Sequence, residues 1–421
     1  MTYRGATSRQ VSLDAKTRQN VKVALVCEWL TNVGGAEKVL LKLHRMYPKA
    51  PIYTSKYTPE KIDWFKDADV RTGWLQIFPS FLRRFLGAFR ARYFAKLDLS
   101  EYDLVISVTG AEAKAVKTTN SETGKSAVHI SYCHVPTQYY WQMYDSYLKN
   151  LGFGVLNPVV RVFFKKMVGK LRQKDFEAAQ RVDQFVTISE YAKEMIEKYY
   201  QREAVVVWPP VEVMEFRRDA EALNFVKDDV SKAQDKVTEA CRSTFEVQGT
   251  TLGVRTYYVT TSRQVTWKRL DLAVKACVEL GRNLVVVGEG PEHKNLMKLA
   301  RGNAGVKFLP LMGKRELAKV LAGAKGYLFP SLEPFGIAPV EAMAAGCPVI
   351  SYGEGGAKDY VKEGVNGVMF KWQTVKSLKE AIVEFEGMEF DKKKVMGSVK
   401  EFEEGRFEKE MRRVVSETMR K

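Results

Sequence analysis

The sequence predicts an α/β protein built from two doubly wound domains, each a parallel sheet covered by helices on both faces. Three observations lead to this class. Short apolar runs, typical of buried strands, alternate with segments of helical periodicity. The alternation stops at a proline-containing stretch near the middle of the chain and then restarts. The 421 residues suffice for two domains, since roughly 100–200 residues make one.

The first predicted domain covers residues 21–210. It opens with an apolar run, a Gly-Gly turn and a helix, and strand-like runs and helical segments then alternate. The run V-V-V-W-P-P-V at 205–211 ends the pattern, because its prolines stop a strand and start a linker. Residues 1–20 are polar, lack the apolar core of a signal peptide and are expected to form an N-terminal tail. Strands are expected at 21–27, 104–108, 128–132 and 184–188, and the first helix at 36–47.

The second predicted domain covers residues 251–398 and follows a linker with a helical insertion at 211–250. The insertion is charged and its apolar residues recur at helical spacing, which favours a surface helical hairpin. A last amphipathic helix is expected within 399–421. The predicted strands lie at 257–261, 283–287, 306–309, 327–329 and 348–352, and the predicted helices at 269–280, 292–300 and 314–322.

The positive charge is concentrated in the first half of the chain. Residues 1–210 carry 32 Lys and Arg against 20 Asp and Glu, whereas residues 211–421 carry 35 against 30. A basic half attracts phosphate-bearing partners, which include nucleic acid, anionic lipid and lipid pyrophosphates. No apolar stretch reaches the roughly 18 residues of a membrane span, so we expect a cytoplasmic protein.

Cysteine and histidine spacing signals neither a disulfide framework nor a metal site. The five cysteines are far apart and form no C-x-x-C pair, and the four histidines show no ligand spacing. We therefore expect no structural metal.

Glu333 and Glu341 enclose a turn that predicts a binding pocket. They lie in S-L-E-P-F-G-I-A-P-V-E, where an apolar strand is followed by Phe335, Gly336 and Ile337 and then by a helix. Backbone N–H groups of such a turn, at the positive end of the helix dipole, face a phosphate, while carboxylates accept hydrogen bonds from hydroxyls. One anionic group with several hydroxyls describes a nucleotide sugar.

Two cations follow the strand predicted at 257–261. Arg263 stands at the strand end and Lys268 at the entry to the next helix. Loops at the carboxyl ends of parallel strands line the ligand crevice, and fixed cations there stabilise the charge of a departing pyrophosphate. The alternative is that both are ordinary solvated cations.

Glycines and one histidine follow other predicted strands. Gly34 and Gly35 precede a helix, so their N–H groups can approach a phosphate, although strand-to-helix turns use glycine routinely. Gly288 and Gly290 either line the nucleotide site or only shape a turn. His134, in C-H-V-P, is expected to bind a sugar hydroxyl, or else to be a satisfied histidine at a strand end.

The run E-P-F-G-I-A-P-V-E resembles the Glu-x7-Glu motif of the retaining glycosyltransferases of family 4, which include sucrose synthase and many bacterial mannosyltransferases. The run S-Y-C-H-V-P-T-Q-Y-Y-W is similar to the mannosyltransferases that build lipid-linked polysaccharides, which usually carry Arg where Gln138 stands. Further matches, in the family's order, are G-G-A-E at 34–37, Ser262-Arg263 with Lys268-Arg269, and V-G-E-G-P-E at 287–292.

The resemblance implies a GT-B fold, in which two Rossmann-like domains face a central cleft and the last helix crosses back to the first domain. It also implies roles for the predicted residues. Arg263 and Lys268 would hold the leaving pyrophosphate, Glu333 would face the donor sugar, and Glu341 would accept bonds from the ribose hydroxyls. His134 would lie in the donor pocket. No covalent nucleophile and no metal are required.

The function implied is transfer of a hexose, mannose from GDP-mannose, to a lipid-linked saccharide at the cytosolic face of the membrane. Two alternatives stay open. One is a GT-B enzyme that uses a UDP-sugar. The other is a basic nucleic-acid-binding protein with a vestigial cleft, although the sequence contains no RNP-like, zinc-finger or helix-turn-helix signal.

Residues 78–96 could form an interfacial membrane helix. At helical spacing its aromatic residues fall on one face, and Arg83, Arg84, Arg90 and Arg92 on the other, which suits an anionic membrane surface. Packing of the apolar face on the domain core is the alternative. Residues 159–174 add a second basic helical stretch.

Overall fold

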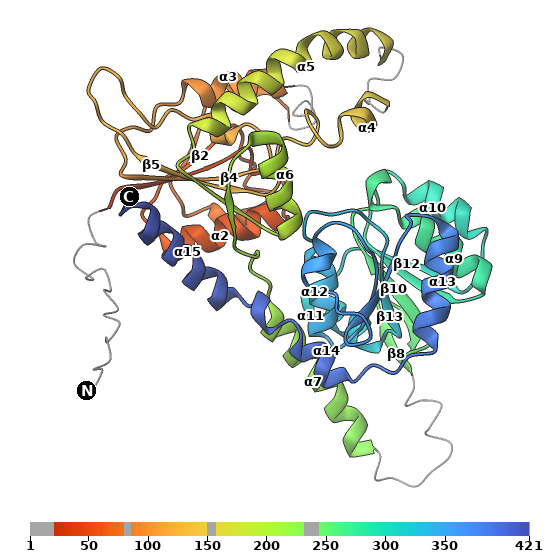
Figure 1. Cartoon of the computed structure of the whole chain (residues 1–421). Helices are drawn as coiled ribbons and strands as arrows, with labels where there is room; N and C mark the ends of the chain where they lie inside the picture. Colours follow the sequence, from red (N-terminus) through yellow and green to blue (C-terminus); the bar gives the residue numbers. More distant parts are fainter. Residues whose placement is uncertain (1–20, 80–85, 150–156, 231–243, 421) are drawn as a thin grey trace, which may run out of the picture. The chain divides into compact units, whose positions relative to one another are not determined.

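The computed structural model describes residues 21–79, 86–149, 157–230 and 244–420. They form two compact units (Figure 1). The first unit comprises Met1–Val186, Ile196–Val205 and Glu408–Lys421, and the second comprises Thr187–Met195 and Val206–Phe407.

The first unit is built on a seven-stranded sheet of order β3-β2-β1-β4-β5-β6-β7. Neighbours from β3 to β5 pair in parallel. The central strands are buried from end to end, as expected when helices cover both faces of a parallel sheet. The strands are β1 (Val23–Cys27), β2 (Ile52–Thr54), β3 (Val70–Thr72), β4 (Leu104–Thr109), β5 (Val128–Cys133), β6 (Gln184–Thr187) and β7 (Ala204–Val206). The helices are α2 (Gly35–Met46), α3 (Gly87–Lys96), α4 (Tyr144–Lys149), α5 (Asn157–Gln180) and α6 (Glu190–Tyr200), with short 3-10 turns η2 (Trp74–Ile77) and η4 (Ala113–Ala115).

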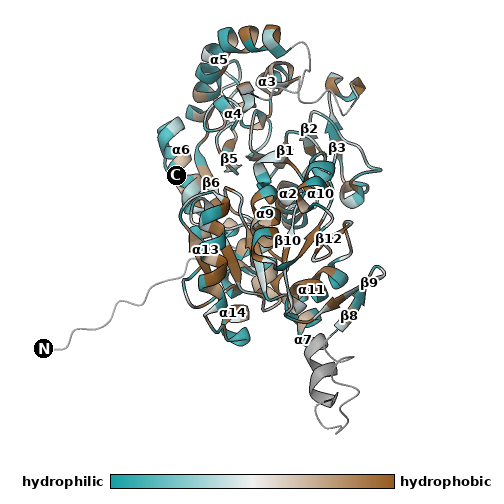
Figure 2. Cartoon of the chain, turned by 90° about the vertical axis from the view of Figure 1, so that its right-hand side faces the viewer, coloured by the Kyte–Doolittle hydropathy of each residue, from teal (hydrophilic) through white to brown (hydrophobic). Residues whose placement is uncertain are grey.

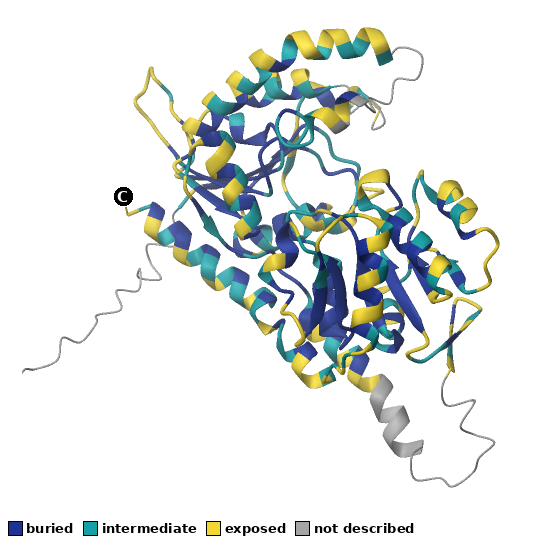
Figure 3. Cartoon of the chain, turned by 45° about the vertical axis from the view of Figure 1, so that its right-hand side comes forward, coloured by how far each residue is buried: buried dark blue, intermediate teal, exposed yellow. Residues whose placement is uncertain are grey.

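The second unit is built on a six-stranded parallel sheet of order β12-β11-β10-β13-β14-β15. Its strands are apolar (Figure 2) and buried (Figure 3). They are β10 (Tyr257–Thr261), β11 (Asn283–Val287), β12 (Val306–Leu309), β13 (Gly326–Phe329), β14 (Val349–Tyr352) and β15 (Gly367–Phe370). The helices are α7 (Val213–Val230), α9 (Leu270–Leu280), α10 (His293–Ala300), α11 (Lys314–Gly323), α12 (Ile337–Ala344), α13 (Val375–Glu386) and α14 (Lys392–Gly397). The unit also contains the 3-10 turns η6 (Thr266–Lys268) and η7 (Gly356–Asp359) and the β8–β9 hairpin (Thr244–Val247, Thr250–Gly253). Helix α15 (Glu404–Thr418) follows in the chain.

Each sheet has one topological switch point, at which the strand order reverses. It lies between β1 and β4 in the first unit and between β10 and β13 in the second. The chain leaves these neighbouring strands toward opposite faces, which opens a crevice outside their carboxyl ends. Ligands of doubly wound sheets bind in that crevice. The prediction of two doubly wound parallel sheets is confirmed, and most predicted strands lie within two residues of their observed bounds.

Two predicted helical segments differ from the structure. In the insertion, α7 ends at Val230, residues 231–243 lie outside the described residues, and Phe245 belongs to a strand instead of a helical hairpin. In the segment 78–96, α3 begins only at Gly87, and residues 80–85, including Arg83 and Arg84, are not described. Among the described residues, no helix is both long and apolar enough to span a membrane.

Candidate functional site

The switch point of the second sheet brings two predicted residues into direct contact. Lys268, at the end of η6 after β10, places Nζ 2.6 Å from Oε1 of Glu333, which follows β13. Ser331 donates a second hydrogen bond of 2.8 Å to the same carboxylate oxygen. Both members of the ion pair are about one fifth exposed, so a ligand in the crevice can reach them.

Arg263 lies on the same loop as Lys268 but is exposed. Within the part of the chain that the structure describes, no hydrogen bond or ion pair joins its guanidinium to another residue. A planar guanidinium with five N–H donors matches phosphate oxygens in a bidentate geometry. The loop after β10 therefore presents one cation held by a carboxylate and one that keeps its donors for a ligand.

Gly288 and Gly290 let the loop after β11 approach the loop after β10. Gly288 has φ +119°, and a Cβ on either glycine would overlap a backbone oxygen of the neighbouring loop, that of Ser262 or of Gln264. The N–H of Gly288 donates to the carbonyl of Leu309 at 2.9 Å, so this donor is not directed at a ligand. The geometry fits the turn-shaping alternative for Gly288 and fixes the position of the Arg263 loop.

The turn from Phe335 to Ile337 opens α12 as the sequence indicates. Gly336 caps the helix at φ +90°, where a Cβ would crowd Phe329 and Tyr360. The first N–H groups of a helix have no intrahelical acceptor and carry the positive end of its dipole. Glu341 lies one turn further along α12 and is buried.

Gly355 and Gly356, after β14, support this turn, and sequence reasoning missed them. The Gly356 N–H donates to the carbonyl of Glu333 at 2.8 Å, and a Cβ on either glycine would overlap the backbone of the Glu333–Pro334 segment. The available signal was the glycine cluster G-E-G-G directly after an apolar strand. These glycines position Glu333 by allowing close backbone contact.

In the first unit, Gly34 and Gly35 begin α2 after β1. Gly34 is the N-cap in extended conformation, and no side chain caps the helix. A Cβ at Gly34 would lie 2.8 Å from Oε2 of Glu37, a buried carboxylate of the first helical turn. The predicted phosphate at this turn would therefore meet a negative charge as well as the helix N-terminus.

His134, directly after β5, is held by the end of β4. Its backbone N–H donates to the Thr109 carbonyl at 2.8 Å, and Nδ1 lies 2.9 Å from the same oxygen. Nδ1 therefore carries the proton, and Nε2 is an acceptor. Nε2 is buried and has no hydrogen-bond partner among the described residues. Burial lowers the pKa of His134, so the ring is neutral near pH 7.

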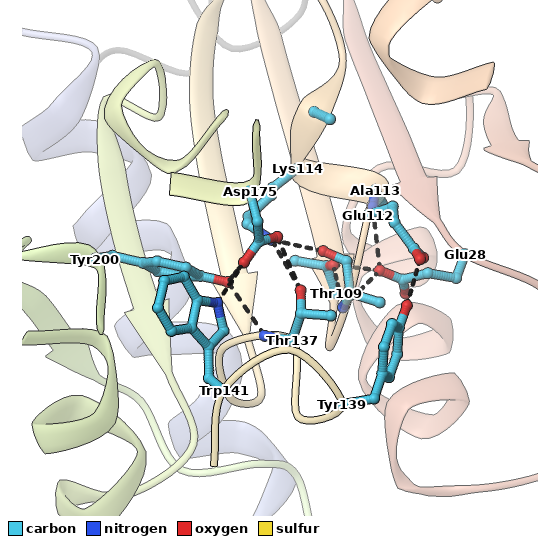
Figure 4. Close-up of polar contacts among 12 residues, drawn as sticks. Glu28, Thr109, Glu112, Ala113, Lys114, Thr137, Tyr139, Trp141, Asp175 and Tyr200 are labelled. Atoms are coloured by element: carbon cyan, nitrogen blue, oxygen red, sulfur yellow. Dashed lines mark hydrogen bonds and ion pairs between the residues drawn. The ribbon is translucent and has the colours of Figure 1, made fainter. Parts of the chain in front are cut away.

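A buried polar network holds the loop after His134 against α5 (Figure 4). Lys114 and Asp175 form an ion pair of 2.6 Å with side chains 1% and 5% exposed. Burial alone would lower the pKa of Lys114, but the Asp175 carboxylate outweighs it, so that the pKa is raised and the amine is charged. Asp175 also accepts hydrogen bonds from Thr137, Trp141 and Tyr200 at 2.7 to 2.9 Å.

A second buried pair corrects the prediction for residues 78–96. Helical periodicity predicts Arg90 on the solvent face of an interfacial helix, but the residue is only 4% exposed. Its guanidinium contacts the Glu112 carboxylate at 3.2 Å and lies over the Trp29 ring. Phe89, predicted on the apolar face, is 52% exposed. The Glu112 carboxylate, which also accepts from Tyr139 (Figure 4), draws Arg90 inward.

Sequence reasoning missed Glu112, Lys114 and Asp175. The signal for the first two was the run A-E-A-K-A directly after β4, where charged residues alternate with small ones at the carboxyl end of a strand. Asp175 gave no signal, because one acidic residue in a basic helix is typical of a solvated face.

The described residues contain no group of three or more His, Cys, Asp or Glu that could hold a metal ion. Cys27, Cys133, Cys277 and Cys347 are buried free thiols, and burial raises their pKa. Cys241 lies outside the described residues.

Residues 250–399 match the family model "Glycosyl transferases group 1". The matched segment lies within the second unit. This segment holds Arg263, Lys268, Glu333 and Glu341, together with both glycine loops.

Curated relatives match in sequence over about a quarter of the chain. Glycogen synthase of Thermus thermophilus is 36% identical over 111 residues, 25% of this chain and 25% of the relative. D-inositol 3-phosphate glycosyltransferase of Mycobacterium leprae is 34% identical over 112 residues, 24% of this chain and 26% of the relative. The matches thus span about a quarter of the length of these relatives.

Solved structures match nearly the whole chain in fold. HepE of Anabaena in complex with UDP superposes with a TM-score of 0.63 at 18% identity, covering 94% of this chain and 100% of that one. WaaG, a glycosyltransferase involved in lipopolysaccharide biosynthesis, superposes with a TM-score of 0.57 at 13% identity, covering 91% and 95%. The two Rossmann-like units therefore match those of GT-B glycosyltransferases, as predicted.

Proposed function

We propose that this protein is a retaining glycosyltransferase that takes a hexose from a nucleotide sugar. The observation that carries the proposal is the pair of cations, Arg263 and Lys268, on the loop after β10, with Lys268 held 2.6 Å from Glu333 of the loop after β13. Both loops lie at the topological switch point, within the segment that matches the group 1 family.

Each group has a task in this reaction. When the sugar leaves its nucleotide, negative charge grows on the diphosphate, and Arg263 and Lys268 stabilise it. The N–H groups at the start of α12 add donors to the same anion. Glu341 accepts hydrogen bonds from ribose hydroxyls, and Glu333 orients Lys268 and faces the donor sugar. Because protein cations meet the charge of the leaving group, the proposal requires no metal, and a chelator is expected to leave turnover unchanged.

The donor proposed is GDP-mannose and the acceptor a lipid-linked saccharide at the cytosolic membrane face. The resemblance of the segment around His134 to mannosyltransferases of lipid-linked polysaccharides supports both, and WaaG is a neighbour in fold from lipopolysaccharide biosynthesis. The second candidate is a UDP-sugar donor, favoured by the UDP complex of HepE among the structural neighbours. In either case His134 Nε2 accepts a hydrogen bond from a sugar hydroxyl.

Sugar transfer is tested with purified protein and radiolabelled sugar nucleotides, GDP- and UDP-linked, with and without a membrane lipid extract. Labelled lipid formed from GDP-mannose, with release of GDP, is the expected result. Labelled lipid from a UDP-sugar alone would replace the donor but keep the reaction. Absence of transfer and of hydrolysis with every donor, together with salt-sensitive retardation of nucleic acid in a gel, would overturn the proposal.

A further inference from the structure

The 24-residue helix α5 carries exposed residues along its whole length (Figure 3). Its inward face carries Val168, Asp175, Ala178 and Ala179, which are all buried. On the opposite face, exposed residues recur every three to four positions, as one side of a helix requires. This outward stripe consists of Val159, Val162, Phe163, Lys166, Lys170 and Lys174.

The outward stripe is apolar at its N-terminal end and basic further along the helix. In the first two turns it is apolar, and Val159, Val162 and Phe163 are 71%, 56% and 64% exposed. From the third turn on it carries three lysines spaced four residues apart. Exposure of large apolar side chains to water is unfavourable, and a cluster of them marks an interaction surface.

The charge around the stripe has one sign. Residues 157–174 contain six Lys and Arg and no Asp or Glu. A protein partner of mixed charge would leave this excess unmatched, whereas a bilayer rich in anionic lipid matches it over its whole area.

We propose that the outward stripe of α5 docks the protein on an anionic lipid bilayer. Val159, Val162 and Phe163 enter the interface, and the lysines meet lipid phosphates. This surface differs from the segment 78–96, in which Arg90 is buried. Its purpose, delivery of a lipid-linked acceptor, rests on the proposed function.

The helix is tied to the loop that carries His134, so docking fixes the distance of that loop from the bilayer. Arg172 of α5 donates to the Tyr140 carbonyl at 2.5 Å and lies over the Trp141 ring. One residue beyond the stripe, Asp175 binds Thr137 and Trp141 (Figure 4). The outward stripe therefore lies on one face of α5, and the candidate sugar-binding loop packs against the opposite face.

Vesicle flotation tests the docking surface directly. The full-length protein is expected to float with vesicles of phosphatidylcholine and phosphatidylglycerol and to stay at the bottom with phosphatidylcholine alone. Lys166→Glu/Lys170→Glu/Lys174→Glu should weaken flotation by at least about a hundredfold, because each lysine near an anionic surface contributes about fivefold. Val159→Ser/Val162→Ser/Phe163→Ser should weaken it in a manner that low salt does not restore.

Exposed residues of the second unit provide matched controls. Lys376→Glu/Lys393→Glu and Val383→Ser change the same residue types at exposed positions and should float like the parent. Circular dichroism verifies that each variant is folded. Failure of the parent to float, or flotation of the lysine variant at parental strength, would overturn the proposal, as would α5 variants that dissociate a dimer without changing flotation.

Donor hydrolysis separates this inference from the proposed function. The lysine variant should hydrolyse the sugar nucleotide at the parental rate while losing transfer to acceptor in vesicles. A parent that floats but neither transfers nor hydrolyses any sugar nucleotide would leave the docking surface standing and remove the glycosyltransferase proposal.

Discussion

Lys268 and Arg263 are chemically similar but differ in their partners. Lys268 is fixed by Glu333 before any ligand arrives, whereas the Arg263 guanidinium is exposed. A group fixed in advance stabilises developing charge without reorganising during the reaction. Lys268 is therefore the residue on which the proposed chemistry depends most.

Removal of that amine is the sharpest mutational test. Lys268→Ala is expected to lower kcat by about 10²-fold or more, a typical loss for a contact that strengthens as charge develops. Arg315→Ala, an exposed cation on α11, serves as the control and should leave kcat unchanged. Steady-state kinetics with the preferred donor measures both, and a Lys268→Ala enzyme of nearly normal kcat would remove the assigned role.

His129 gives a prediction on pH. It is fully buried on β5 with Nε2 2.9 Å from the Ser107 hydroxyl, and burial lowers its pKa from 6.5 to about 3. Below pH 6.5 the unfolded chain therefore binds a proton at this residue that the folded protein does not bind. The free energy of unfolding consequently decreases as the pH is lowered. At pH 5 the loss from this residue is about 2 kcal/mol. The free energy of unfolding, measured with urea, should decrease less between pH 7 and pH 5 for His129→Gln than for the parent. An equal decrease would contradict this prediction.

At the scale of elements, the buried pair Lys114–Asp175 joins the loop after β4, the loop after β5 and helix α5. Desolvation offsets much of the attraction in such a pair, so it contributes more to the arrangement of these elements than to net stability. Loss of one partner alone is a different matter, because it leaves a buried charge.

Single and double substitutions separate these effects. Lys114→Met and Asp175→Asn should each destabilise the protein by about 3–5 kcal/mol, and the double variant by clearly less than their sum. Lys358→Met breaks an exposed pair with Glu354 and should cost at most about 1 kcal/mol. Denaturant titration gives all four values; additive losses in the double variant would show that the charges do not interact.

The elements themselves could be predicted well and the polar network poorly, for a physical reason. Apolar runs such as residues 284–287 are buried wherever they lie in the chain, so composition and spacing suffice to predict them. The same holds for the turn at Gly336, which only glycine enters at low cost. The partner of Asp175 lies 61 residues away, and no local pattern encodes such a pairing.

Residues 78–96 illustrate the same limit. Helical spacing placed Arg90 opposite the aromatic residues, which is what the periodicity of a lone helix indicates. Glu112 reverses that arrangement by offering a buried carboxylate 22 residues later in the chain. The sequence therefore left open whether this segment binds a membrane or packs on the core, and the fold uses its Arg90 internally.

For the whole molecule, the donor is the property that fold alone leaves open. Structural neighbours with 13% to 18% identity share the two Rossmann-like units. One fold can serve many different substrates, so the shared fold does not identify the donor. A ligand that binds only the folded protein raises its Tm by an amount set by concentration over Kd.

Thermal unfolding with free nucleotides ranks the two candidate donors. At equal concentration, GDP and GDP-mannose should raise Tm more than UDP and UDP-glucose, as expected if the second unit recognises guanine. ADP serves as a control for unspecific diphosphate binding. A shift with UDP alone would replace the proposed donor by the second candidate.

The four buried thiols have a practical consequence for following this protein in solution. Maleimides react with exposed thiolates, and Cys27, Cys133, Cys277 and Cys347 are neither exposed nor readily ionised. Once Cys241 is replaced by serine, a single cysteine introduced at position 163 should take up a fluorescent reporter selectively under native conditions. The four buried cysteines then need no replacement, and the fluorescence of the dye reports the polarity of its surroundings at position 163.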